Sequence, residues 1–142
     1  MSPKKRTTEA GTAIVEAALT LLLFFTLLMA IMEGGRFLNV QQTLTNAARE
    51  GARTAVAPLT QTSTLASDGE IETEVRRFLD AARVSGATVT VQRPIVIQAN
   101  GVPMECTRVT TSVTYQVFSL AAFSNLSVNL TGEALMRNET SP

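Results

Sequence analysis

Residues 11–36 read GTAIVEAALTLLLFFTLLMAIMEGGR, a nearly unbroken apolar run close to the N-terminus. Between Thr12 and Met32 the only polar side chains are three threonines and Glu16. As an α-helix rising ~1.5 Å per residue, the segment from Thr12 to Met32 is roughly 31 Å long, which matches the ~30 Å hydrocarbon core of a bilayer. The sequence therefore predicts a transmembrane helix over residues 12–35, with one carboxylate inside it.

A short basic leader precedes this helix. Lys4, Lys5 and Arg6 are followed by a polar spacer and then Gly11, and Glu16 lies five positions further on. The basic cluster predicts a cytoplasmic N-terminus and an exported remainder, since positive charges stay on the cytoplasmic side. The whole layout resembles a type IV pilin signal. The resemblance implies that a prepilin peptidase cuts between Gly11 and Thr12, which removes residues 1–11 as a leader.

Two other interpretations of the N-terminus stay open. A secretory signal peptide has an apolar core of about 7–15 residues and a small-residue cleavage site, whereas this run is longer and carries an acid. The second alternative is a plain signal anchor that is not cleaved and in which Glu16 is incidental. The spacing of glycine and glutamate is a weak pattern by itself, and its position between a basic leader and a membrane helix gives it weight. The fate of the leader distinguishes the alternatives.

Glu16 is the unusual residue of the predicted membrane helix. A carboxylate at the centre of a bilayer costs on the order of 2.5–3.5 kcal/mol, so an acid there indicates a function. After cleavage Glu16 would lie only four residues from the new N-terminus, about 6 Å along the helix. We expect it to pair with the α-amine of Thr12, on the same or a neighbouring subunit, and to set the register between packed helices.

The composition limits what the rest of the chain can do. The chain has 142 residues and a formal net charge of zero, which leaves room for one small domain and gives no indication of nucleic-acid binding. It contains no histidine, and we find no nucleophile motif and no metal-ligand cluster, so we expect neither an enzyme nor a cofactor. Cys106 is the only cysteine; it cannot form an intramolecular disulfide, and we expect it to be buried.

A second helical pattern, over residues 37–57, follows the membrane segment. Gly34 and Gly35 lie between the two segments and weaken the helix by about 1 kcal/mol each, which suggests a joint rather than a true break. One apolar stripe narrows along this helix from large to small side chains, which predicts close packing at its small residues. The stripe consists of Phe37, Val40, Leu44, Ala48, Gly51 and Ala55, and we assign helix packing to Ala48, Gly51 and Ala55.

The remaining residues predict a short helix and a small sheet. Ser67 and Glu70 fit a capping box that opens a helix over residues 70–84, which Gly86 would end. Strands are expected at 88–91 and 95–98, interrupted by Pro94, then at 107–117 and 126–137, with a turn at Asn100-Gly101 longer than two residues. The fold class is therefore α+β: a long N-terminal helix, a second short helix and a small antiparallel sheet. Residues 36–142 would form the exported head.

Four motifs make the resemblance more specific than a pilin signal. They are EAAL from Glu16, MEGGR from Met32, AAREGAR from Ala47 and ALMRNE from Ala134. In this order they are similar to the TadE-like family of minor pilins, or pseudopilins, of the tight-adherence (Tad/Flp) pilus.

The resemblance implies a single-pass protein of the bacterial inner membrane, with a periplasmic or extracellular head, that helps to prime a pilus or sits at its tip. The implied partners are a prepilin peptidase, the major Flp pilin, other Tad pseudopilins, the inner-membrane assembly platform and membrane lipid.

Overall fold

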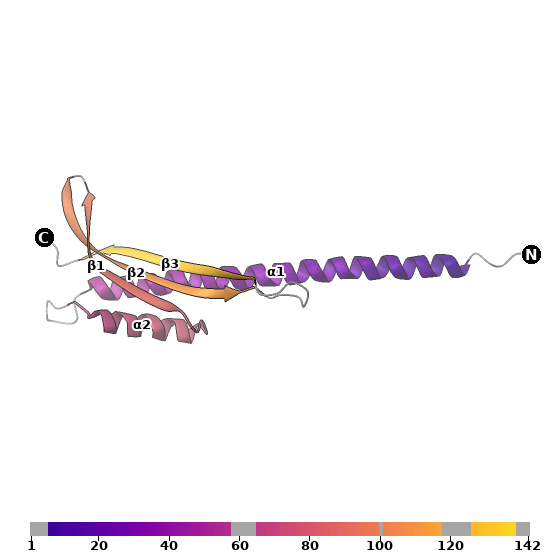
Figure 1. The fold of residues 1–142 in the computed structure, drawn as a ribbon, viewed down its shortest axis with the longest axis horizontal. Helices are drawn as coiled ribbons and strands as arrows, with labels where there is room; N and C mark the ends of the chain where they lie inside the picture. Colours follow the sequence, from indigo (N-terminus) through magenta and orange to yellow (C-terminus); the bar gives the residue numbers. More distant parts are fainter. Residues whose placement is uncertain (1–5, 58–64, 100, 118–125, 139–142) are drawn as a thin grey trace, which may run out of the picture. The chain divides into compact units, whose positions relative to one another are not determined.

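The computed structural model describes residues 6–57, 65–99, 101–117 and 126–138. Within these ranges the chain forms, in order, α1 (Arg6–Val56), α2 (Asp68–Ala81), β1 (Thr88–Ala99), β2 (Val102–Gln116) and β3 (Ser127–Arg137) (Figure 1). The chain divides into two compact units, Met1–Arg36 and Phe37–Pro142, and α1 contributes to both. The predicted α+β class, with a long helix, a short helix and an antiparallel sheet, is confirmed.

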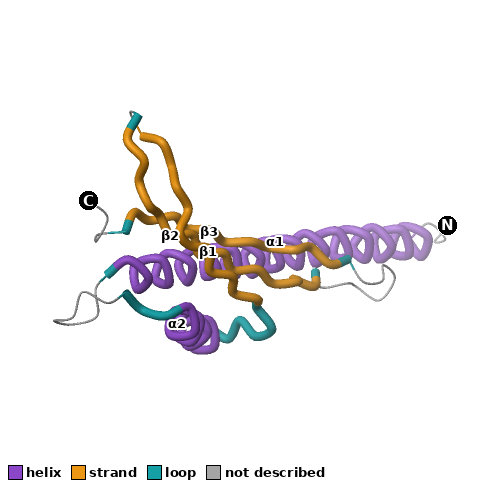
Figure 2. Tube along the Cα trace, turned by 60° about the vertical axis from the view of Figure 1, so that its left-hand side comes forward, coloured by secondary structure: helices purple, strands orange, loops and turns teal. Residues whose placement is uncertain are grey.

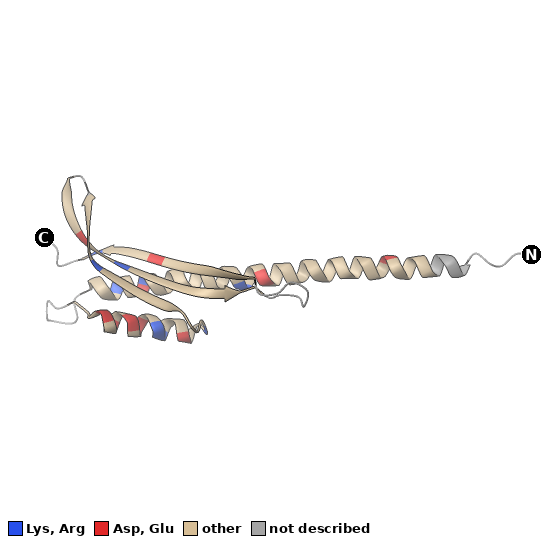
Figure 3. Cartoon of the chain, in the orientation of Figure 1, with Lys and Arg blue, Asp and Glu red and all other residues tan. Residues whose placement is uncertain are grey.

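The first unit contains the apolar part of α1. This is the one helix among the described residues that is long and apolar enough to cross a membrane, and Figure 3 shows its long stretch with almost no charge. That suggests a single-pass membrane anchor. Gly34 and Gly35, where the sequence suggests a joint, are both helical. Two glycines lower the stability of the helix by only about 2 kcal/mol in total, and the hydrogen-bonded turns on either side compensate for this loss.

The sheet has three antiparallel strands in the order β1-β2-β3. The two strands predicted on either side of Pro94 are wrong, because β1 is a single strand. Its register against β2 shifts between Gln92 and Ile95, so a bulge accommodates the proline, which has no amide hydrogen to donate. The predicted long turn is also wrong. Ala99 pairs directly with Val102, and Gly101 adopts a φ of 79°, as a two-residue hairpin turn requires.

The second helix begins at the predicted capping box, with Asp68 rather than residue 70 as its first residue, and it ends earlier than predicted. The Ser67 hydroxyl and the Glu70 carboxylate form the capping box at the N-terminal end of the helix, where Ser67 is the N-cap residue. The helix stops at Ala81 rather than at Gly86, because Arg83 takes a left-handed φ of 59° and its amide bonds to the carbonyl oxygen of Asp80 at 2.9 Å. As a result no basic residue lies in the last turn.

The core lies between the two helices and one side of the sheet (Figure 2). Ile71, Val75 and Leu79 of α2 are buried, whereas Phe78 and Ala82 are exposed. On β2 the alternate residues Val109 and Thr111 are fully buried. Cys106 is 4% exposed, so its predicted burial is confirmed. The head therefore has two layers, helices on sheet.

Candidate functional site

The predicted cleavage junction lies within α1. Gly11 and Thr12 are both helical and exposed in the uncleaved chain. A β carbon placed on Gly11 would meet no atom within 4 Å, so the structure itself does not require a glycine there. The need for a small residue would therefore come from a processing enzyme, and the cleavage stays a prediction.

Glu16 lies on an exposed face of α1, one helical turn beyond the junction. Ala13, Ala17 and Thr20 surround it and leave a shallow hollow beside the carboxylate. Within the described part of the chain, Glu16 forms no ion pair or hydrogen bond through its side chain. In the uncleaved chain Thr12 has a peptide nitrogen instead of an amine, so the predicted pair requires cleavage first.

The small residues of α1 are used inside the head. Ala48 and Ala55 are fully buried, and Gly51 is buried between α2 and β2. A β carbon on Gly51 would collide with Cγ2 of Val75 and lie 3.1 Å from Cγ1 of Val109. The helix therefore approaches both neighbours so closely that a larger residue at this position would have to displace their side-chain methyl groups. This face of α1 is not available to another subunit.

A second close approach was not foreseen from the sequence. Gly132 of β3 crosses α1 at Leu44, and a β carbon there would lie 2.5 Å from the amide nitrogen of Thr45. The buried hydroxyl of Thr111 donates a hydrogen bond to the carbonyl oxygen of Leu44 at 2.9 Å. The available signal was the glycine inside an alternating strand, between Leu130 and Ala134, since such a glycine often marks a close backbone contact.

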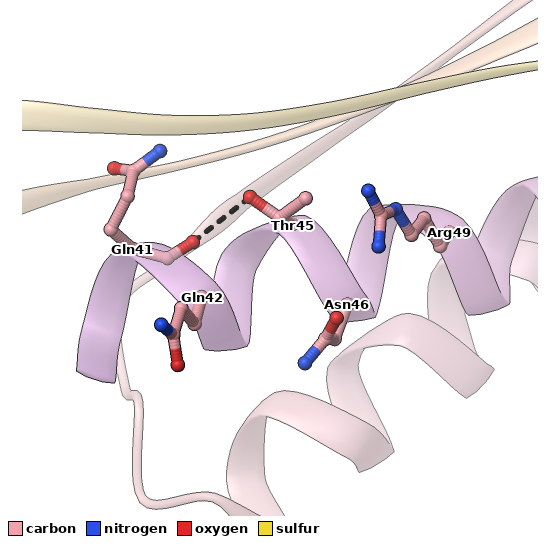
Figure 4. A pocket seen from close by; sticks show the side chains of 5 residues that line it. All are labelled: Gln41, Gln42, Thr45, Asn46 and Arg49. Carbon is pink, nitrogen blue, oxygen red and sulfur yellow. Dashed lines mark hydrogen bonds between the residues drawn. The ribbon is translucent and has the colours of Figure 1, made fainter. Parts of the chain in front are cut away.

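Another part of α1 carries a polar groove of about 400 Å³, which the sequence reading also missed (Figure 4). The Gln41 amide donates to the carbonyl oxygen of Thr131 at 2.9 Å, and the Thr45 hydroxyl donates to the carbonyl oxygen of Gln41 at 3.0 Å. Gln42, Asn46 and Arg49 are exposed, and their side chains bond to nothing in the described ranges. Among the described residues, the groove thus exposes two amides and one guanidinium group that have no partner.

Most other charges of the head are paired along α2 and across the sheet. Arg76 contacts Glu72 at 2.6 Å, and Arg77 contacts Glu74 at 2.6 Å. The hydrogen bond from Arg77 lowers the pKa of Glu74. Within the described residues no cluster of three histidine, cysteine or acidic side chains could hold a metal ion.

Two ion pairs tie separate elements together. Arg93, at the bulge of β1, contacts Asp68 at the start of α2 at 2.6 Å. Nε of Arg108 lies 2.8 Å from a Glu133 oxygen, but its N–H makes no hydrogen bond, so this contact is an ion pair alone.

The N-terminal part of the chain matches a known family. Residues 11–53 fit the family model described as TadE-like protein. This segment is TadE-like. The match covers less than half of the chain, and it includes the apolar part of α1, the apolar stripe from Phe37 to Gly51 and the polar groove. It confirms the resemblance for the three motifs that begin at Glu16, Met32 and Ala47, whereas the motif that begins at Ala134 lies outside the match. The match suggests a protein associated with a Tad pilus. Searches of curated proteins and of solved structures gave no match.

Proposed function

We propose that this protein is a minor pilin, or pseudopilin, that takes part in assembling a Tad/Flp pilus used in adhesion, by priming the fibre or occupying its tip. The observation that carries the proposal is the TadE-like match over residues 11–53, together with an apolar helix long enough to span a bilayer. The protein acts through binding and not through catalysis. Its partners are the prepilin peptidase, the major Flp pilin, other pseudopilins and the inner-membrane assembly platform.

In this role each part of the chain has a distinct task. The apolar part of α1 holds the protein in the inner membrane until assembly and supplies a helix that packs with other pilin helices. The head, with Ala48, Gly51 and Ala55 buried in its own core, is a folded unit on the exported side. Glu16 sets the register between helices once the leader has been removed.

The N-terminus of the mature protein tests the proposal. Mass spectrometry of the full chain extracted from host membranes should find a mature chain that begins at Thr12. Gly11→Val should block processing, because a β-branched side chain does not fit where the peptidase requires a very small one. Gly34→Val is the matched control, since Gly34 also lies on α1 with no atom within 4 Å of a β carbon.

The other possible outcomes contradict the pilin role. A chain that still begins at Met1 would indicate a periplasmic binding or assembly module held by an uncleaved signal anchor. A chain that begins beyond Met32 would indicate an ordinary secretory signal. Normal piliation in a strain that lacks the gene would also exclude a role in assembly.

A further inference from the structure

The covalent connection to the apolar segment of α1 brings one end of the head close to the bilayer. Phe37 is the first residue of the head unit, and it follows the predicted span of residues 12–35 by two positions, which is ~3 Å along a helix. The headgroup region on each side of the hydrocarbon core is about 5–7 Å thick. In a membrane-held chain Phe37 therefore lies at headgroup depth, whatever the orientation of the head.

Two strands of the sheet share this end of the head with Phe37. The ring of Tyr115 on β2 packs edge-on against the ring of Phe37, with the centroids 5.8 Å apart. Tyr115 pairs with Val128 of β3, and beyond that pair the Val117 amide donates a hydrogen bond to the carbonyl oxygen of Leu126 at 3.0 Å. A strand rises ~3.4 Å per residue, so Leu126 lies ~7 Å further along the sheet than Val128.

The order of contacts along α1 gives the direction of these strands. Thr111 donates its hydrogen bond to Leu44, whereas Tyr115, later on the same strand, contacts Phe37, earlier on the helix. β2 therefore runs toward the end of the head at which α1 continues into the apolar segment, and the antiparallel β3 starts from that end (Figure 1).

This end of the head exposes apolar side chains and carries no charge. Leu38, Leu126 and Val128 are 58%, 63% and 38% exposed. The three stretches that form this end contain no acidic or basic residue; they are 37–48, 109–117 and 126–132. Apolar side chains among uncharged polar ones suit the boundary between headgroups and acyl chains, where an apolar face is buried about 5–10 Å deep.

Exposed apolar residues at the far end of the sheet differ in this respect. Val96 and Val102, in the hairpin of β1 and β2, are 58% and 57% exposed. Val102 is at the opposite end of β2 from Tyr115, and Val96 pairs with the charged Glu105. Exposure alone therefore does not single out a surface. The connection to the membrane segment distinguishes the end that carries Leu126.

We propose that the end of the head formed by Leu38, Leu126 and Val128 rests on the bilayer that holds α1, with these side chains inserted among the lipid headgroups on the exported side. The inference rests on the membrane anchor of the proposed function and deepens it, because it gives the membrane-held head a second contact with lipid. The apolar segment keeps the bilayer at this end, and the patch has no charge that would guide a protein partner. For the same reason the contact should not depend on salt.

Tryptophan fluorescence in vesicles tests the proposal. The chain contains no tryptophan, so Leu126→Trp introduces a single one. The full chain is extracted from host membranes and reconstituted into phosphatidylcholine vesicles with or without bromine on the acyl chains. We expect a blue-shifted emission that the brominated lipid quenches, to the same extent at low and high salt. Val96→Trp is the matched control, because Val96 is similarly exposed, and its emission should be that of a tryptophan in water and should not be quenched.

A second set of variants separates the patch from the affinity of tryptophan itself for the interface. In the Leu126→Trp chain, combining Leu38→Asp with Val128→Asp should remove most of the quenching, because the two carboxylates oppose insertion. Val102→Asp in the same background is the control and should leave the quenching unchanged. Limited proteolysis checks that each variant is folded, and Leu38→Asp alone replaces the pair if the pair is not.

Several results would overturn the proposal while the proposed function stands. One is a water-like emission of Leu126→Trp in a chain that remains in the membrane, and another is equal quenching of Leu126→Trp and Val96→Trp. A blue-shifted emission that brominated lipid does not quench would show that protein, from this chain or a second one, covers the patch. Quenching that the folded aspartate variants leave unchanged would also contradict the proposal.

Failure of the proposed function gives different results. If alkaline carbonate releases the parent chain from host membranes, the membrane anchor is wrong, and the lipid contact of the head fails with it. If pili form normally without the gene while Leu126→Trp is quenched as expected, the role in pilus assembly fails and the lipid contact stands.

Discussion

Gly132 of β3 lies directly against the backbone of Leu44 on α1. A β carbon on Gly132 would be 2.6 Å from the carbonyl oxygen of Leu44, well inside van der Waals contact. The same carbonyl accepts a hydrogen bond from the hydroxyl of Thr111 on the neighbouring strand. The crossing therefore fixes where the sheet sits on the helix within the head.

Gly132→Ala should destabilise the head by about 1–3 kcal/mol, because the added methyl group meets helix backbone, which cannot move aside. Urea unfolding of the full chain in detergent measures this. Fluorescence of Tyr115, the only tyrosine, reports the head, since its ring packs edge-on against Phe37 at 5.8 Å. Gly69→Ala is the control, with no atom within 4 Å of its β carbon. Equal stability of the two variants would contradict the close crossing.

At Gly51 the obstacle is different, and so is the expected result. A β carbon there meets side-chain methyl groups of Val75 and Val109, which can rotate, rather than backbone. Gly51→Ala also gains about 1 kcal/mol of helix propensity, so it should be close to neutral. Gly51→Leu should lower the free energy of unfolding by about 1–3 kcal/mol, because the methyl groups of the two valines cannot make room for a leucine side chain. The same urea series tests this order, and an unchanged midpoint for Gly51→Leu would show that α1 does not pack there.

Thr111→Val should cost about 0.5–1.5 kcal/mol, although the two side chains have nearly the same shape. The valine removes the hydroxyl that donates to Leu44 at 2.9 Å. The carbonyl oxygen keeps its bond within the helix, so no buried acceptor is left without a partner. Thr114→Val, on the exposed side of the same strand, is the matched control and should be neutral. A loss no larger than that of the control would mean that the hydrogen bond adds nothing.

The sequence predicts the elements of this fold well and their contacts poorly. Long periodic segments such as α1 are visible in one dimension, and the capping box at Ser67 is a local pattern. The single strand across Pro94 cannot be recognised from the local sequence, because its bulge depends on pairing with a distant strand. The contact of Gly132 with Leu44 arises from tertiary packing. Local periodicity carries no information about which face a distant strand leaves open.

The capping box should make the head sensitive to acid. Hydrogen bonds from the backbone amide and hydroxyl of Ser67 lower the pKa of Glu70 below its ordinary value of 4.5. The stabilisation is therefore fully present above pH 4.5 and is lost as the pH falls through the lower pKa of the folded state. Glu70→Gln should weaken the head at pH 7 and differ less from the parent at pH 3.

Urea midpoints measured from pH 7 to pH 3 test this dependence. Ser67→Ala removes the hydroxyl of the cap, so it should reduce the same acid sensitivity, and combining it with Glu70→Gln should add little. If the difference between parent and Glu70→Gln stayed constant across this range, the carboxylate would not be the stabilising form.

Glu16→Val separates processing from assembly. In the membrane-held monomer Glu16 is close enough to the helix end to reach the headgroup region, which relieves most of its desolvation cost. Packed helices close that route, and a buried charge without a partner costs several kcal/mol. We therefore expect the valine variant to be cleaved and inserted normally but to lose its association with the major pilin, because its helix no longer has a partner for the Thr12 amine. Co-purification of the major pilin with parent and variant measures this, with Thr20→Val as a control for a polar residue on the same helix. Equal recovery for parent and Glu16→Val would show that Glu16 is a remnant of the signal and does not direct assembly.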